Sequence, residues 1–301
     1  MSDKVIRSHP TVILHRLTVV SLGATVPILH GGLDDRSSGP TIAFTVALWG
    51  LWGILLLGML VPSSVALTAA RLAVASHTAT IVVLTIRDAS DSDGIDTAGL
   101  VAVAISVGAL LIAFTAEVGN SYVQGSAYGD ERRFLLKAPH ALAAAQVVSF
   151  GVWFATTFAS VSALVAGAWI VGLLLALPAV LLSVILPSRF HRFSRRWLVK
   201  VPAGLVVHDH VVLAETAMFT RSAVRSIAVR DPGQRTDPDD LDSPSDLTGG
   251  LRGGVVVSLD DFDTVVLAAR TRRDQARPVH LRSFAVRPSR VVNAVTELTR
   301  P

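Results

Sequence analysis

Long runs of hydrophobic residues fill the first two-thirds of this chain. Residues 41–86 and 141–186 are each long enough to cross a bilayer twice, and residues 99–117 form a third run. A helix needs about 20 mainly apolar residues to span the roughly 30 Å of hydrocarbon in a bilayer. The mean hydropathy of the chain is +0.54. The pattern therefore predicts a polytopic, α-helical integral membrane bundle rather than an ordinary soluble domain.

Polar and helix-breaking residues divide these runs into separate helices. Pro62 ends one run and suits the start of the next, because proline disrupts a helix interior but is accepted in a first turn. A polar loop follows at 87–96, and we expect a short turn near Ser160 and Ser162 to close the last helical hairpin. The six expected spans are 11–30, 41–61, 65–86, 99–117, 141–161 and 164–186.

The first of these segments, 11–30, has three competing interpretations. It is mostly apolar but contains His15 and Arg16, so it is a sixth span, an interfacial amphipathic helix or a cleaved signal peptide. A small-x-small cleavage site is missing after its apolar core, which argues against a signal peptide. We favour a sixth span in which the Arg16 side chain snorkels from near the helix end to the headgroups.

Basic residues orient the six spans. If both chain termini are cytoplasmic, the inner segments hold ten basic residues and the outer loops hold two, which is the bias of the positive-inside rule. We therefore expect a protein of the cell (inner) membrane with cytoplasmic N- and C-termini. The inner residues are Lys4, Arg7, Arg132, Arg133, Lys137, Arg189, Arg192, Arg195, Arg196 and Lys200, and the outer ones are Arg36 and Arg87.

After residue 187 the pattern changes to short segments that are rich in Val, Leu and Phe and broken by turn residues, which is typical of strands. The last segment, 289–300, has apolar residues at helical spacing. Residues 188–301 are thus predicted to form a small β-rich α+β domain. Within it, 231–254 is rich in Pro, Asp, Gly and Ser and is predicted to be a flexible loop. The expected strands are 197–201, 205–208, 211–214, 217–220, 224–229, 255–259, 264–269 and 279–286.

Two stretches resemble a known group of sequences. Residues 196–215, which begin Arg196-Trp-Leu-Val-Lys-Val-Pro-Ala-Gly, and residues 60–71 are similar to uncharacterised multi-pass membrane proteins of high-GC bacteria. The strand series with its terminal helix also looks like a bacterial pleckstrin-homology-like (PH-like) domain. The resemblance implies several spans followed by a cytoplasmic PH-like domain, and it carries no catalytic residues over to this chain.

Ionisable side chains inside apolar helices are costly and suggest function by default. Arg71 lies about two turns from the cytoplasmic end of its helix, and Glu117 reaches the same side at the end of the next. Asn120 and Gln124 share a helical face with Glu117, and Gln146 enters at a similar depth. We predict an intramembrane polar cluster around an Arg71–Glu117 pair. This cluster either holds neighbouring helices together through hydrogen bonds or forms a substrate or ion site.

The segment after the last span interleaves basic and aromatic side chains. Such a flank suits a membrane interface, where each cation gains roughly 1 kcal/mol against anionic lipid. It serves either as a plain stop-transfer flank or as a site for lipid headgroups. The predicted lipid-interface residues are Arg189, Phe190, Arg192, Phe193, Arg195 and Arg196.

Three histidines, His208, His210 and His280, are candidate metal ligands, but Asp209 between two Val-rich runs is typical of a hairpin turn, so we expect no metal. The chain has no Cys, which excludes disulfides and thiolate sites. Metalloprotease, nucleophile-elbow and kinase motifs are missing from the sequence. The excess of basic residues lies at membrane flanks, so we expect no nucleic-acid partner. We also expect no cofactor.

These observations favour a non-enzymatic membrane scaffold or sensor whose cytoplasmic PH-like domain binds a partner protein or an anionic lipid. The alternative is a small-solute or ion transporter or channel that uses the polar cluster around Arg71 and Glu117. A membrane-embedded enzyme is disfavoured by the missing motifs. The pattern leaves the oligomeric state open.

Overall fold

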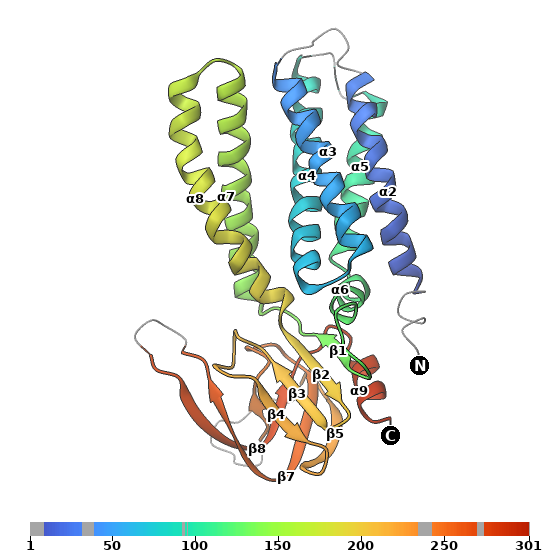
Figure 1. The fold of residues 1–301 in the computed structure, drawn as a ribbon, viewed down its shortest axis with the longest axis vertical. Coiled ribbons are helices and arrows are strands. Elements are labelled where there is room, and N and C mark those ends of the chain that lie inside the picture. Colours follow the sequence, from blue (N-terminus) through green and yellow to red (C-terminus); the bar gives the residue numbers. More distant parts are fainter. Residues whose placement is uncertain are drawn as a thin grey trace. The chain divides into compact units, whose positions relative to one another are not determined.

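The structure is a computed structural model that describes residues 9–31, 39–91, 94, 96–233, 243–269 and 274–300. Within this part of the chain there are eight helices and eight strands, which Figure 1 shows in chain order. They fall into two compact units. The helical unit comprises Met1–Gly125 and Gln146–Phe190, and the β-rich unit comprises Ser126–Ala145 and His191–Pro301.

Five helices in the described ranges are long and apolar enough to cross a membrane. A bent pair, α5 (Thr97–Ala113) and α6 (Ala116–Gln124), meets the same test together, with an angle of 60° between its members. Five of the six long apolar helices expected from the sequence are therefore confirmed, including the first, and the sixth corresponds to the bent pair. The five are α2 (Pro10–Gly31), α3 (Gly39–Leu60), α4 (Ser64–Asp91), α7 (His140–Val165) and α8 (Trp169–Ser194).

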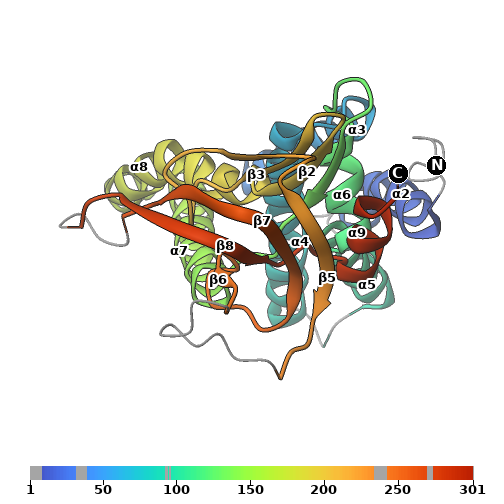
Figure 2. The same ribbon diagram turned by 90° about the horizontal axis from the view of Figure 1, so that it is seen from below.

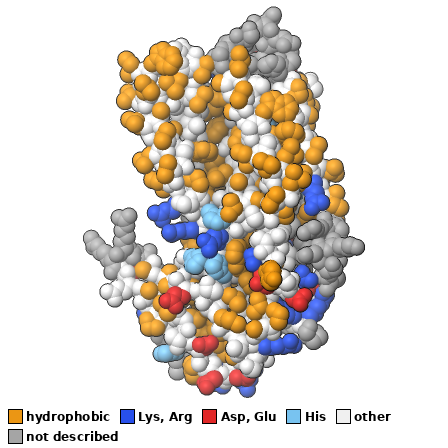
Figure 3. Space-filling model, in the orientation of Figure 1, with side chains coloured by type: hydrophobic (Ala, Val, Ile, Leu, Met, Phe, Trp, Pro, Cys, Tyr) orange, Lys and Arg blue, Asp and Glu red, His pale blue; other side chains and the backbone are white. Residues whose placement is uncertain are grey.

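Large apolar side chains point outward from the helices. Leu57, Leu177 and Val184 are each about two-thirds exposed or more, and hydrophobic side chains cover the visible face of the helices in Figure 3. Between the helices, buried apolar side chains such as Leu48 and Ile81 pack together, and hydrogen-bonding groups add further contacts. Trp52 Nε1 donates to the Val19 carbonyl oxygen at 2.9 Å, and Thr78 Oγ1 donates to that of Ser106 at 3.0 Å. Such contacts are typical of helices that pack in lipid.

Several helix ends differ from the predicted ones, and α4 continues to Asp91 and α8 to Ser194 where the spans were expected to end at residues 86 and 186. The turn expected near Ser160 lies later, because α7 continues to Val165 and the chain reverses around Gly167, whose φ is +80°. The Ser160 hydroxyl does not end α7 but donates to the Gly172 carbonyl oxygen of α8 at 2.9 Å. The span expected at 99–117 also ends early, since α5 stops at Ala113 and the 60° bend follows.

The β-rich unit contains two four-stranded sheets, which Figure 2 shows from below. In the first sheet, neighbours pair antiparallel in the order β1–β2–β3–β4. In the second, the order is β5–β7–β8–β6, and only β6 runs parallel to its neighbour. The strands are β1 (Arg132–Leu135), β2 (Trp197–Val201), β3 (Gly204–His208), β4 (Ala217–Thr220), β5 (Val224–Arg230), β6 (Ser245–Asp246), β7 (Gly254–Leu267) and β8 (Arg277–Val286).

One apolar core joins the two sheets and the terminal helix α9 (Val291–Leu298). Phe219 of the first sheet stacks on Phe284 of the second with 4.6 Å between ring centroids. Ala294 and Leu298 of α9 are buried in the same core. Lys200 of β2 donates to two carbonyl oxygens at the end of α9, where the partial negative charge of a helix C-terminus favours a cation.

Strand β1 precedes α7 in the chain, although its partner β2 follows α8. Leu135 pairs with Trp197, and the Leu136 amide donates to the Arg196 carbonyl oxygen at 2.9 Å. The Lys137 amide bonds the carbonyl oxygen of Arg287, just after β8. The hairpin of α7 and α8 is thus inserted between the first and second strands of the β-rich unit. The domain predicted to begin at residue 188 left out this segment.

Part of the loop predicted to be flexible, 231–254, is ordered. Residues 243–254 include β6, and Leu247 and Leu251 are buried. The Asp246 carboxylate accepts hydrogen bonds from the amide and hydroxyl of Thr248. The flexible assignment is therefore wrong for residues 243–254, while 234–242 lie outside the described residues.

Three of the predicted strands differ in the structure. The segment 211–214 forms a turn with an isolated bridge from Leu213 to Leu267. The two strands expected at 255–259 and 264–269 belong to one long strand, β7, whose register with β8 shifts between Ser258 and Asp263. The polar residues Asp260 and Asp261 occupy this irregularity.

Candidate functional site

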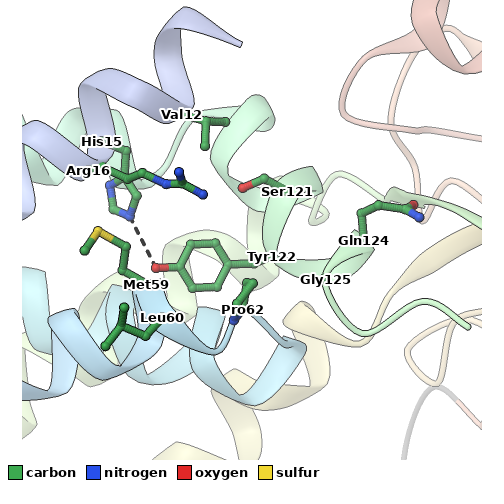
Figure 4. A pocket seen from close by; sticks show the side chains of 10 residues that line it. All are labelled: Val12, His15, Arg16, Met59, Leu60, Pro62, Ser121, Tyr122, Gln124 and Gly125. Atoms are coloured by element: carbon green, nitrogen blue, oxygen red, sulfur yellow. Dashed lines mark hydrogen bonds between the residues drawn. The ribbon is translucent and has the colours of Figure 1, made fainter. Parts of the chain in front are cut away.

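A cavity of about 140 Å³ lies in the helical unit where α2, the turn between α3 and α4, and α6 meet (Figure 4). Three helical elements therefore enclose it. It combines apolar walls with hydroxyl, imidazole, amide and guanidinium groups. The residues that line it are Val12, His15, Arg16, Met59, Leu60, Pro62, Ser121, Tyr122, Gln124 and Gly125.

Local sequence places these elements against each other. The Ser63 hydroxyl accepts a hydrogen bond from the Ala66 amide at 3.1 Å, which starts α4 directly after Pro62. A Cβ added to Gly125 would lie 2.6 Å from the Pro62 carbonyl oxygen, so the end of α6 approaches the turn as closely as only glycine permits. The bend before α6 turns this short helix toward the turn, and its residue Tyr122 then faces the cavity (Figure 4).

A buried histidine–tyrosine pair forms one wall of the cavity. His15 is 2% exposed and Tyr122 is 3% exposed. His15 Nε2 and the Tyr122 hydroxyl are 3.3 Å apart, and the two rings meet edge to face. His15 Nδ1 is buried and has no hydrogen-bond partner among the described residues. The Tyr122 hydroxyl is also within electrostatic range of Arg16 and Arg71.

The structure brings only part of the predicted polar cluster to this cavity. Gln124 is buried and lines it. Arg71 places its guanidinium carbon 5.0 Å from the centre of the Phe114 ring, a cation–π contact. Glu117 and Asn120 are half-buried on α6, and Glu117 lies in the first turn of that helix rather than at the end of α5.

The Arg71–Glu117 pair stays a prediction, as does a role for Gln146, which is half-buried on α7. Sequence reasoning missed the central residues of the cavity. His15 and Arg16 were noticed only as polar intrusions in an apolar segment, and Tyr122 lay outside every predicted span. The sequence signal that could have indicated Tyr122 is the amphipathic pattern of α6, a polar helix whose apolar residues recur on one face.

The predicted lipid-interface residues divide into two groups. Arg189 and Arg192 are exposed on the last turns of α8, and Arg195 is exposed just after it. Phe190 is buried and Phe193 is half-buried.

Arg196 is 1% exposed and forms a two-pronged ion pair with Asp209. Its Nε and Nη2 atoms lie 2.8 and 2.7 Å from the two carboxylate oxygens, and Nη1 donates to the Lys137 carbonyl oxygen at 3.0 Å. The prediction that Arg196 lies at the lipid interface is therefore wrong. Because Trp197 pairs with His208, the residues just outside this pair, Arg196 and Asp209, meet inside the β-rich unit.

The histidines considered as metal ligands have other contacts. The His208 ring stacks on the Trp197 ring with 5.1 Å between the ring centroids. The His210 ring meets the His208 ring edge to face with 4.4 Å between the centroids. His208 Nδ1 lies 2.9 Å from the Thr216 hydroxyl oxygen, and His280 lies 2.8 Å from that of Thr264. Burial, together with the nearby His210 and Arg195, lowers the pKa of His208 to about 4. In the described ranges, no group of three or more His, Asp or Glu side chains gathers as a metal site.

No protein-family model, curated protein or solved structure matches this chain. The resemblance to multi-pass membrane proteins with a PH-like domain therefore stays a prediction, and function has to be argued from the residues themselves.

Proposed function

We propose that this chain is a multi-pass protein of the cell membrane that acts as a non-enzymatic scaffold or sensor. In this proposal α2, α3, α4, the bent pair α5–α6, α7 and α8 are six spans. The β-rich unit is a PH-like domain at the cytoplasmic face, on the same side as the N-terminus. It binds an anionic lipid or a partner protein.

Membrane insertion is supported by the outward apolar side chains of the helices. Exposed Leu and Val side chains would disfavour the folded state in water, whereas hydrocarbon accepts them without cost. A long helix also satisfies the backbone groups of its interior by its own hydrogen bonds, as a bilayer requires, and only its end groups need other partners. An interfacial helix and a cleaved signal peptide are the other interpretations of segment 11–30. Both are less compatible with a 22-residue helix whose residues Leu22 and Val26 pack inside the helical unit.

The observation that carries the proposal is the insertion of the α7–α8 hairpin between β1 and β2. The hairpin leaves and re-enters the β-rich unit at two residues that are directly hydrogen bonded, Leu136 and Arg196. A hairpin that crosses the membrane twice must return to the side from which it left. The chain therefore connects the β-rich unit to the helical unit after α6, before α7 and after α8, which supports a binding domain on one side of the membrane.

An anionic lipid is the ligand that the exposed side chains favour. Arg189 and Arg192 are three residues apart on α8 and so lie on neighbouring sides of this helix, and Arg195 follows directly after its end. Three cations at the end of an apolar helix are attracted to the anionic lipids of a cytoplasmic leaflet. The two-sheet architecture with its terminal helix supports a PH-like assignment by its arrangement alone.

The test uses the full-length protein in nanodiscs made with phosphatidylcholine alone or with added phosphatidylglycerol. Hydrogen exchange of residues 189–195 should slow in the anionic discs, and the combined changes Arg189→Gln, Arg192→Gln and Arg195→Gln should abolish the effect. A matched control replaces three exposed arginines of the β-rich unit by Gln, at Arg221, Arg225 and Arg282. Equal exchange in both lipids would reject lipid binding by this flank and leave a protein partner as the remaining form of the proposal.

A further inference from the structure

We propose that the cavity between α2, the α3–α4 turn and α6 binds a phosphate group, with Arg16 as its main ligand and the hydroxyls of Ser121 and Tyr122 as further donors. The site belongs to the helical unit and is independent of the β-rich unit and its basic flank. The phosphate comes either from a lipid headgroup or from a soluble phosphate compound.

The donors come from two different helices and converge on one space. Figure 4 shows the Arg16 side chain extending from α2 toward the space in front of Tyr122, with the Ser121 hydroxyl facing the same space from α6. A guanidinium group presents several N–H donors in a plane that matches phosphate oxygens. The Ser121 hydroxyl donates to the Val118 carbonyl oxygen at 2.8 Å, and on binding it would turn from this backbone oxygen to an oxygen of the phosphate.

The charges at the cavity are positive and lack carboxylate partners in ion pairs. The ion pairs of Arg133 with Glu131, Arg196 with Asp209, Arg225 with Asp260 and Arg300 with Glu297 all belong to the β-rich unit. None of these neutralises Arg16 or Arg71. Arg71 does not line the cavity but interacts electrostatically with Tyr122, which does, and its buried Nε has no hydrogen-bond partner among the described residues. An anion is the ligand that this arrangement attracts.

The pair of His15 and Tyr122 gives the cavity a fixed wall. Both side chains are almost fully buried, so the Tyr122 hydroxyl has a defined position beside the open space. The hydroxyl has a single proton, so it donates to a ligand in the tautomer in which His15 Nε2–H donates to the Tyr122 oxygen. The volume of about 140 Å³ is roughly ten times what one enclosed water needs, so the cavity has room for a phosphate group.

The binding test uses full-length protein in maltoside micelles, which contain no phosphate. Inorganic phosphate is titrated at constant ionic strength, with chloride as the control anion, and unfolding is followed by tryptophan fluorescence. In a second arm, micelles contain phosphatidic acid or, as the matched lipid without phosphate, diacylglycerol, and native mass spectrometry counts the retained lipids. Stabilisation by phosphate or retention of one phosphatidic acid supports the site.

The two arms distinguish the source of the phosphate. Binding of phosphatidic acid alone identifies a lipid headgroup, and binding of inorganic phosphate identifies a soluble ligand. Arg16→Gln should weaken the observed binding tenfold or more, because it removes a charge-assisted hydrogen bond, whereas Arg87→Gln, an exposed arginine of α4, should leave it unchanged.

Tyr122→Phe and Ser121→Ala test the same site with smaller changes and keep the helices intact if Arg16→Gln fails to fold. Each should weaken binding several-fold. The proposal is overturned if neither inorganic phosphate nor phosphatidic acid binds, or if all three variants bind as the unaltered protein does.

Discussion

Removal of strand β1 from the β-rich unit should abolish its folding. A soluble chain of residues 195–301 retains the other seven strands and α9 but lacks Arg132–Leu135 and the two residues that follow. A second chain restores them by joining residues 126–137 through Asn-Gly to residue 195. The register places residues 137 and 195 opposite each other at the end of an antiparallel pair, where an Asn-Gly turn forms a hairpin.

The expected loss follows from the contacts of β1. Leu135 and Leu136 are 5% and 4% exposed, and burial of a leucine side chain contributes about 1.5–3 kcal/mol. Four hydrogen bonds also link residues 135–137 to Arg196, Arg287 and Ser289, each with a net contribution of about 1 kcal/mol. Together these amount to about 7–10 kcal/mol, which is comparable with the whole stability of a typical domain.

Urea unfolding followed by circular dichroism compares the two chains. The joined chain should unfold in one cooperative transition, and residues 195–301 alone should show none. Addition of a peptide of residues 126–137 to the shorter chain should restore part of the β signal. The reasoning is refuted if residues 195–301 unfold cooperatively within about 1 kcal/mol of the joined chain.

Three further predictions concern single side chains. Asp209→Ala should destabilise the joined chain by about 3–5 kcal/mol in urea unfolding, because it leaves the buried Arg196 charge unpaired; Glu297→Ala, which removes an exposed pair, should cost less than about 1 kcal/mol. The pKa of His208 is about 4 when folded and near 6.5 when unfolded, so the unfolded chain takes up this proton first. Stability should therefore fall as the pH drops from about 6.5 to 4, and His208→Asn should show a smaller fall; equal falls would contradict this. Gly125→Val should lower the Tm of the full-length protein, since its side chain would collide with the α3–α4 turn, and an unchanged Tm would show that this close approach is not needed.

The long helices could be predicted because their signal is local. About 20 consecutive apolar residues identify a span without any knowledge of its neighbours. Most strands of the β-rich unit were predicted for the same reason, since runs such as Trp197–Val201 carry their own pattern. The bend between α5 and α6 and the true position of the α7–α8 turn needed the contacts between helices, which a run of residues does not contain.

Strand β1 and the role of Arg196 could not be predicted locally. Arg132–Leu135 is a four-residue segment with two arginines, and the partner that makes it a strand lies about 60 residues later. Arg196 belongs by composition to the basic flank, yet strand register places it against Asp209 inside the β-rich unit. The cavity likewise depends on His15 and Tyr122, which are separated by 107 positions.

The placement of the β-rich unit relative to the membrane is tested most directly by cysteine labelling, because the chain has no cysteine of its own. Single substitutions Asp130→Cys, Ala168→Cys and Met218→Cys place exposed thiols before β1, in the α7–α8 turn and on β4. A membrane-impermeant maleimide should label residue 168 in intact cells, and residues 130 and 218 only after permeabilisation. Labelling of residue 218 in intact cells, or the same accessibility at 130 and 168, would contradict the account.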